Sequence, residues 1–178
     1  MRRRPGTPSA RYRLNAGVIM PIILQPPGTN LFGSGADILV NAVNTRGVMG
    51  AGLALQFKQR YPSMFAAYRD RCQSALVSIG SIDVHIVETH SPRTVMVANF
   101  PTKEHWRDPS KLQWIEAGLV ALRQVIIESQ ARSIAIPPLG CGLGGLDWSD
   151  VSNRIVESLT PVAEAGVDVL LYPPASRN

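Results

Sequence analysis

The segment at residues 40–58 constrains the fold most strongly, because it changes from a strand to a helix within a few residues. An apolar run ends in VNAVN at 40–44, GVMGAG follows at 47–52, and Leu53 and Phe57 then lie four residues apart, as on one face of a helix. Glycine permits positive φ and close approach of a backbone to a ligand, and the first N–H groups of a helix favour an anion. The segment predicts a phosphate-binding turn, and a tight strand-to-helix turn without a ligand is the alternative.

The rest of the chain alternates strand and helix patterns from 38 to 172. Strands are expected at 21–24, 38–43, 82–87, 93–98, 133–136 and 167–172, the third and fourth as a hairpin. Helices are expected after the glycine turn, at 63–74, from Ser110 and at 148–159. Ser110 and Gln113 have the spacing of a capping box. The pattern predicts a three-layer α/β sandwich with a mixed sheet of roughly six strands.

The net charge of +5 is located in the N-terminal arm. Five arginines occur among the first 13 residues without an acidic residue, whereas the remainder balances 13 basic against 13 acidic residues. The arm lacks the apolar stretch of a signal peptide, so a cytoplasmic protein is expected. Residues 1–19 are predicted to be a disordered basic extension, or an over-long start before Met20. Residues 20–178 are predicted to form a single domain.

The two cysteines, Cys72 and Cys141, lie far apart without CxxC spacing. The sequence therefore predicts neither a disulfide framework nor a metal site, and no cofactor is expected. A membrane-bound form is not expected either, and the chain is predicted to be a monomer.

A second glycine-rich loop, PLGCGLGG at 138–145, also follows a buried strand and precedes a helix. Loops at the carboxyl ends of strands in one α/β sheet meet at the same ligand crevice. Two such loops are therefore predicted to hold two phosphates, or a phosphate and a sugar, through backbone N–H groups.

Three blocks of the sequence resemble the macrodomain family of ADP-ribose-binding α/β modules. They are VNAVN with GVMGAG, FPTK at 100–103 with HW at 105–106, and PPLGCGLGGLDW at 137–148. The resemblance is strongest to the bacterial branch typified by DarG, the DNA ADP-ribosyl glycohydrolase, with terminal ADP-ribose protein glycohydrolase as a more distant relative. It covers about residues 21–175 and implies a macrodomain fold and ADP-ribose as the ligand.

The resemblance also implies roles for particular residues. Lys103 is implicated in catalysis, and Asn41 is expected to hold the distal ribose. The first loop would flank the distal ribose and pyrophosphate, and the second would cradle the diphosphate. The remaining residues implied to bind ADP-ribose are Asn30, Asn44, Gly47, Val48, Met49, Gly50, Ala51, Gly52, Pro138, Leu139, Gly140, Cys141, Gly142, Leu143, Gly144, Gly145 and Tyr172.

Two departures from the family pattern affect these expectations. The family usually has Gly-Asp after the first strand, where the aspartate accepts from adenine, and this chain has Thr29-Asn30. An asparagine oxygen accepts without charge assistance, so weaker adenine binding is expected. The glycohydrolase relative has a catalytic aspartate where this chain has Gly144, and Asp147 is better interpreted as the N-cap of the next helix.

Three functions are compatible with this sequence. The first is a hydrolase that removes mono-ADP-ribose from acidic residues of proteins, from thymidine in DNA, or from both. The second is a module that binds ADP-ribose without turnover, and the third is an O-acetyl-ADP-ribose deacetylase. Lys103 favours the first, either as an uncharged nucleophile that forms a Schiff base or as a protonated group that stabilises the leaving atom.

Overall fold

The computed structural model describes residues 10–13, 19–87 and 94–175. The elements in chain order are β1 (Ala10–Arg13), β2 (Ile19–Leu24), the 3-10 helix η1 (Leu31–Gly33), β3 (Ile38–Asn44), α1 (Gly52–Arg60), α2 (Pro62–Gln73), β4 (Asp83–Val87), β5 (Val95–Lys103), α3 (Leu112–Ser129), β6 (Ser133–Ile136), α4 (Trp148–Glu164) and β7 (Asp168–Leu171).

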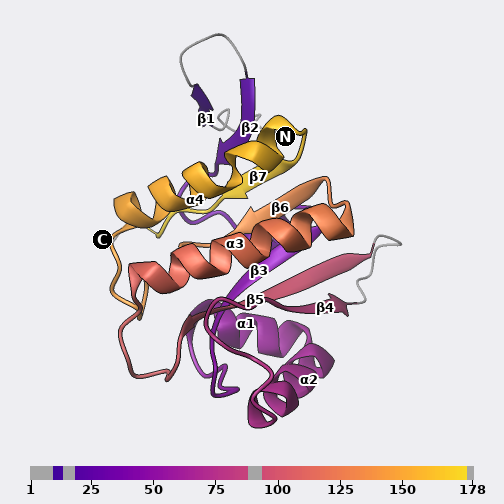
Figure 1. The fold of residues 1–178 in the computed structure, drawn as a ribbon, viewed down its shortest axis with the longest axis vertical. Coiled ribbons are helices and arrows are strands. Elements are labelled where there is room, and N and C mark those ends of the chain that lie inside the picture. Colours follow the sequence, from indigo (N-terminus) through magenta and orange to yellow (C-terminus); the bar gives the residue numbers. More distant parts are fainter. Residues whose placement is uncertain (1–9, 14–18, 88–93, 176–178) are drawn as a thin grey trace, which may run out of the picture.

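A seven-stranded mixed sheet forms the centre of the molecule (Figure 1), with the strand order β1-β2-β7-β6-β3-β5-β4. The five inner strands pair in parallel, whereas β1 and β4 at the two edges run antiparallel to their neighbours. The predicted α/β sandwich with a mixed sheet is therefore confirmed. The β4–β5 hairpin is also as predicted, although residues 88–93, which connect its strands, lie outside the described residues.

Helices cover both faces of the sheet. Side chains of a strand alternate between its two faces, and in β3 Val40 packs into the core covered by α3 and α4, while Leu39 packs into the core covered by α1 and α2. Because β3 pairs in parallel with β5 and with β6, the carboxyl ends of these three strands point to the same edge, where the two glycine-rich loops begin. No helix in the described parts of the chain is long and apolar enough to cross a membrane.

The N-terminal region differs from the predicted disordered extension over residues 1–19. Strand β1 lies within it and pairs antiparallel with β2, where Ala10 faces Leu24 and Arg11 faces Ile23. The free edge of β2 supplies hydrogen-bonding partners for this short strand. Residues 1–9 and 14–18 lie outside the described residues, so a domain boundary near residue 20 stays a prediction.

The capping box predicted at the start of α3 is wrong. The helix begins at Leu112, and its N-cap is Lys111, whose side chain makes no capping hydrogen bond. Ser110 is instead buried, and its backbone N–H donates to the carbonyl of Gly144 at 2.9 Å. The Ser110 Oγ has no hydrogen-bond partner among the described residues, so it caps no helix.

Candidate functional site

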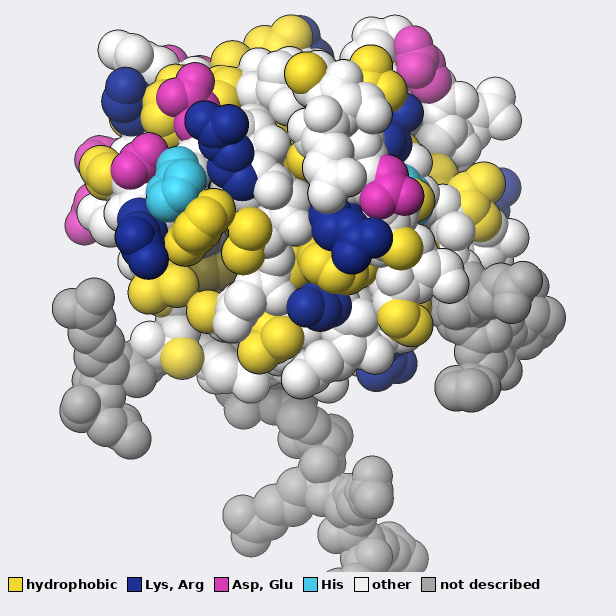
Figure 2. Space-filling model, turned by 90° about the horizontal axis from the view of Figure 1, so that it is seen from below, with side chains coloured by type: hydrophobic (Ala, Val, Ile, Leu, Met, Phe, Trp, Pro, Cys, Tyr) yellow, Lys and Arg dark blue, Asp and Glu magenta, His cyan; other side chains and the backbone are white. Residues whose placement is uncertain are grey.

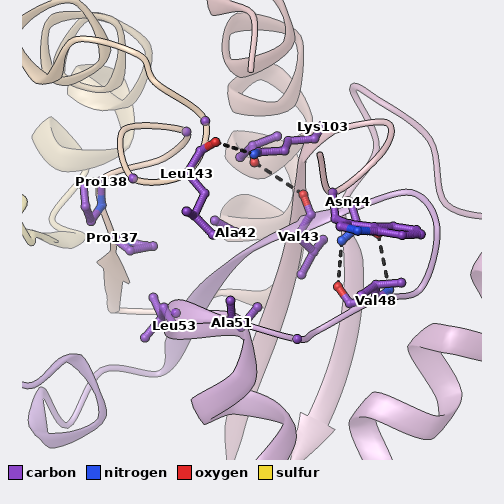
Figure 3. Close-up of a pocket in the computed structure, with 18 residues that line it drawn as sticks. Ala42, Val43, Asn44, Val48, Ala51, Leu53, Lys103, Pro137, Pro138 and Leu143 are labelled. Carbon is purple, nitrogen blue, oxygen red and sulfur yellow. Dashed lines mark hydrogen bonds between the residues drawn. The ribbon is translucent and has the colours of Figure 1, made fainter. Parts of the chain in front are cut away.

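A cavity of about 570 Å³ lies at the carboxyl ends of β3, β5 and β6 (Figure 3). This volume is in the range of small-molecule sites. The lining comes from both glycine-rich loops, the ends of these strands and the first turn of α1. The lining residues are Ala42, Val43, Asn44, Val48, Gly50, Ala51, Gly52, Leu53, Ala54, Thr102, Lys103, Trp106, Pro137, Pro138, Gly140, Gly142, Leu143 and Gly144.

Asn44 shapes the first glycine loop. Its Oδ1 accepts from the N–H groups of Arg46 (2.9 Å) and Val48 (3.3 Å), and its Nδ2 donates to the Val48 carbonyl at 2.6 Å. Gly47 has φ of +75°, and a Cβ there would lie 3.2 Å from the backbone of α2, so a glycine is required. The hydroxyl of buried Tyr68 donates to the Asn44 carbonyl from behind. The loop is therefore fixed in shape before any ligand arrives.

The first turn of α1 borders this loop. The N-cap, Ala51, supplies no side-chain cap to it. Because the first N–H groups of a helix have no partner within the helix, they are available to an anionic ligand.

The second glycine loop is a compact turn packed against Ser110. Gly140 has φ of +71°, and its carbonyl accepts from the N–H of Leu146 at 3.1 Å. A Cβ at Gly144 would lie 2.3 Å from both the Gly140 oxygen and the Ser110 Oγ. This position consequently has no room for a side chain unless the loop moves, so the loop in this shape does not fit the aspartate of the glycohydrolase relative.

Lys103 lies at the end of β5, between the two loops. The residue is only 8% exposed, and its Nζ donates to the Leu143 carbonyl at 2.7 Å (Figure 3). Burial lowers the pKa of the Lys103 ammonium from its ordinary value, and the charge of Asp108 partly offsets that effect. A lowered pKa increases the fraction of uncharged amine, which is the nucleophilic form.

Asn41 does not line the cavity. It is fully buried on the α1/α2 side of β3, where its Nδ2 donates to Asn99 Oδ1 at 2.9 Å and lies 3.8 Å from Met49 Sδ. Its Oδ1 has no hydrogen-bond partner among the described residues. Asn44 at the strand end reaches the cavity instead. Contact between Asn41 and the distal ribose stays a prediction.

Asp83 fixes the direction of the Asn41 amide. Asp83, Asn99 and Asn41 lie side by side on β4, β5 and β3. An ionised carboxylate only accepts, so Asn99 presents Nδ2 to Asp83 (3.2 Å) and Oδ1 to Asn41. His85 Nε2 lies 2.7 Å from the same carboxylate oxygen, Oδ2, and Arg71 Nε holds the other oxygen, Oδ1, at 2.6 Å. The charge of Asp83 therefore decides that the unpaired atom of Asn41 is its oxygen.

Replacing Asp83 with asparagine is expected to lower the free energy of unfolding at pH 7 by about 1–3 kcal/mol, because charge-assisted hydrogen bonds to a buried group are lost. Burial alone would raise the pKa of Asp83, but hydrogen bonds from His85 and Asn99 lower it overall. A carboxyl whose pKa is lower in the folded state stabilises the protein above its unfolded pKa. That contribution is lost as the pH falls through the folded value.

Urea unfolding of wild type and Asp83→Asn at pH 7 and at stepwise lower pH measures this effect. The difference between the two proteins should shrink as the pH falls below about 4, the ordinary pKa of an aspartate, because the unfolded chain then takes up a proton before the folded one does. Asp70→Asn is the matched control, because Asp70 forms an exposed ion pair with Arg69 and should change stability by less than about 0.5 kcal/mol. A pH-independent difference would contradict the proposed role of the charge.

The structure brings many of the predicted site residues together. Eleven of them line the cavity: Asn44, Val48, Gly50, Ala51, Gly52, Lys103, Pro138, Gly140, Gly142, Leu143 and Gly144. The predicted residues outside its lining are Asn30, Asn41, Gly47, Met49, Leu139, Cys141, Gly145 and Tyr172. Met49 and Leu139 are buried in the two cores, so their side chains support the loops from behind.

The lining also includes residues that sequence reasoning did not assign to the site. Thr102 precedes Lys103 in β5, and Leu53 and Ala54 belong to the first turn of α1. Their proximity to predicted residues was the available signal. From the sequence, His105 and Trp106 beside Lys103 are predicted either to line the entrance and stack on a base or ribose, or to form a satellite apolar cluster. The structure places Trp106 in the cavity wall.

Two residues near the second loop have structural roles. Asp147 caps α4, since its side chain accepts from the Ser149 N–H at 2.7 Å, as predicted. Burial, together with the charge of Asp147, raises the pKa of the Cys141 thiol to about 12. Cys141 is therefore a protonated packing residue at neutral pH.

The predicted adenine residues lie apart from the cavity lining. Asn30 is exposed, and its Oδ1 accepts from the Phe32 N–H at 3.0 Å, which caps η1. Tyr172 is buried in the core under α1 and α2. Burial raises the pKa of its hydroxyl, and a hydrogen bond with Ser34 acts in the opposite direction. Their contact with adenine stays a prediction.

Comparison with known proteins agrees with this architecture. The Macro domain family model matches residues 40–155. The DNA ADP-ribosyl glycohydrolase of Mycobacterium tuberculosis is 48% identical over 149 residues, and that of Thermus aquaticus is 47% identical over 146. Both alignments cover 82% of this chain, but 41% and 39% of the relatives. The chain therefore spans about two fifths of the length of these curated relatives.

Two solved structures show the same fold. The macrodomain of Mycobacterium tuberculosis DarG has 46% sequence identity and a TM-score of 0.79, with 86% of this chain and 99% of that chain covered. Thermosipho africanus DarTG in complex with ADP-ribose has 30% identity and a TM-score of 0.76, with 88% and 42% covered.

Proposed function

This chain belongs to the macrodomain family, and we propose that it is a hydrolase that releases ADP-ribose from ADP-ribosylated DNA. The observation that carries the proposal is the position of Lys103. Its amine is nearly buried in the wall of a cavity built from two glycine-rich loops. Relatives with close to half of their aligned residues identical are named DNA ADP-ribosyl glycohydrolases, which supports DNA as the substrate.

The two loops are proposed to bind the diphosphate and the distal ribose of ADP-ribose. Backbone N–H groups at a glycine-rich turn and at a helix start favour phosphate. With the diphosphate held there, the anomeric carbon C1″ would lie at the Lys103 end of the cavity. The apolar side chains of Leu53 and Leu143 in the lining would limit the access of water to this end.

The uncharged amine of Lys103 is proposed to attack C1″. Its Nζ forms a bond to C1″ as the bond from C1″ to the nucleobase nitrogen breaks, and the electron pair leaves with the base. The nitrogen of the base takes up the proton that Nζ loses, and opening of the ribose ring gives a Schiff base. Water then adds to C1″, which releases ADP-ribose and returns the amine. A protonated Lys103 that stabilises the leaving nitrogen is the alternative role.

The deciding experiment is incubation of the wild-type protein with two substrates. One is a single-stranded oligonucleotide with one ADP-ribosylated thymidine, and the other is a protein mono-ADP-ribosylated on glutamate. We expect free ADP-ribose and intact oligonucleotide from the first, measured by chromatography and mass spectrometry. Turnover of the protein substrate alone would move the proposal to protein esters. No turnover of either, with ADP-ribose binding in calorimetry, would indicate a binding module.

The proposed thymidine linkage follows from the resemblance to the DarG-type branch. Removal of ADP-ribose from acidic residues of proteins would use the same cavity and is an outcome of the same assay. Deacetylation would use this cavity too, and O-acetyl-ADP-ribose as a third substrate tests it. The cytoplasmic location and the monomeric state stay predictions.

A further inference from the structure

The turn that follows Lys103 is anchored at its base to the first glycine loop. The Thr45 N–H donates to the carbonyls of Lys103 (3.1 Å) and Glu104 (3.2 Å), and its Oγ1 donates to the Glu104 carbonyl at 3.0 Å. Further along the turn, the Asp108 N–H donates to the His105 carbonyl at 3.1 Å. Because both ends are hydrogen-bonded, the turn holds its shape without a ligand, and ordering it on binding costs little entropy.

Trp106 at the tip of this turn is only partly packed. Its indole stacks on the His105 imidazole with ring centres 3.8 Å apart, and the imidazole is held by the Arg107 N–H, which donates to Nδ1 at 3.2 Å. The residue nevertheless keeps 43% of its surface exposed while it lines the cavity. A large aromatic side chain supported on one side and open to a cavity is typical of a binding surface.

Trp106 lies at the end of the cavity where the reaction would occur. It is three residues beyond Lys103, and both line the same cavity. The Lys103 amine binds the carbonyl of Leu143, whose side chain is 79% exposed and lies in the lining too. A group attached to C1″ would therefore leave the cavity between these exposed apolar side chains.

We propose that Trp106, supported by His105, stacks on the nucleobase that carries the ADP-ribose. This inference rests on the proposed function, because only a DNA substrate supplies a flat aromatic leaving group at C1″. Stacking on an aromatic side chain is a general means of holding unpaired bases. An aspartate or glutamate ester would gain little from the same surface.

Stacking on Trp106 accounts for recognition of the DNA substrate better than attraction of the DNA phosphates to the charges of this turn does. Figure 2 shows hydrophobic side chains around a hollow, with a histidine and Lys and Arg side chains next to them. Arg107 lies 5.9 Å from the indole, but Glu104 and Asp108 on the same turn are exposed as well. Since the charges of the turn nearly balance, the contribution of Trp106 should depend little on salt.

The test compares wild type, Trp106→Ala and Trp106→Phe on the ADP-ribosylated oligonucleotide and on the ADP-ribosylated protein. Trp106→Ala should lower kcat/KM for the oligonucleotide by about 10-fold or more, mainly through KM. Its affinity for free ADP-ribose, measured by calorimetry, should stay close to that of the wild type. Trp106→Phe should restore most of the activity, and the loss should be similar at low and high salt. Trp114→Ala is the matched control, because Trp114 lies on α3 outside the cavity lining.

The outcomes separate this inference from the proposed function. If wild type does not release ADP-ribose from the oligonucleotide, the proposed function fails and the inference fails with it. If wild type is active and Trp106→Ala matches it, or loses activity equally on the protein substrate, only the stacking role is overturned. Equal losses in kcat/KM and in ADP-ribose affinity would show that Trp106 binds ADP-ribose itself, which would also overturn it.

Discussion

Replacing Lys103 with alanine is expected to lower kcat for ADP-ribose release by about 100-fold or more, the usual effect of removing a group that acts on the reacting atoms. Among the described residues that line the cavity, Lys103 is the one with a basic side chain. Burial lowers the pKa of its amine. The affinity for ADP-ribose should change much less, because backbone groups of the two loops are proposed to supply most of the binding. Single-turnover release and calorimetry measure the two quantities separately.

Two further measurements distinguish the roles of the amine. Arginine at this position keeps the charge but does not lose its proton, so Lys103→Arg should be as inactive as Lys103→Ala if the amine is a nucleophile. Borohydride added during turnover should then leave a covalent ADP-ribosyl adduct on Lys103 of the wild type. Activity should also rise with pH towards the lowered pKa, since only the uncharged amine attacks.

Lys58→Ala is the matched control for this prediction. Lys58 lies on α1, with its Nζ 4.4 Å from the Phe65 ring and outside the cavity lining, so its removal should leave kcat nearly unchanged. Retention of more than one tenth of wild-type activity by Lys103→Ala would exclude a direct catalytic role. Substantial activity of Lys103→Arg without a trapped adduct would favour electrostatic stabilisation over covalent catalysis.

The strand, the glycine turn and the helix at 40–58 could be predicted because their signals are local. Apolar periodicity identifies β3, and glycines at positions with positive φ, such as Gly47, identify the turn. The alternation of elements then predicts a sheet whose loops converge at one edge. Lys103 entered the site through the family resemblance, and its partner Leu143, 40 residues away, became visible only in the structure.

Contacts across the sheet and between loops were less predictable. Asn41 and Asn44 are three residues apart in one strand, so their side chains do not point to the same face, and only the latter reaches the cavity. The row formed by Asn41, Asn99 and Asp83 depends on strand register, which one sequence does not reveal. At Ser110 the local capping pattern failed, because the residue is buried against the second loop and its Oγ caps no helix.

Introducing an aspartate at Gly144, where the related glycohydrolase has its catalytic acid, is expected to damage the site rather than supply an acid. A Cβ at this position would lie 2.3 Å from the Gly140 carbonyl oxygen and from the Ser110 Oγ. The Gly140 oxygen is backbone and cannot rotate away, so the second loop would have to move. Gly144→Asp and Gly144→Ala should each lower ADP-ribose affinity by about 10-fold or more and the free energy of unfolding by about 1–3 kcal/mol.

Gly142→Ala is the control for stability, because no atom lies within 4 Å of the Cβ that it adds, and it should unfold like wild type. Ser110→Ala combined with Gly144→Ala should not restore binding, because it removes the Oγ contact and leaves the clash with the Gly140 carbonyl. Calorimetry and urea unfolding measure both effects. Wild-type affinity in Gly144→Asp would show that the loop rearranges easily, and increased turnover would show that an acid can act from this position. If both Gly144 variants instead lose binding, the shape of the loop excludes an acid at this position, as the proposed reaction through Lys103 requires none there.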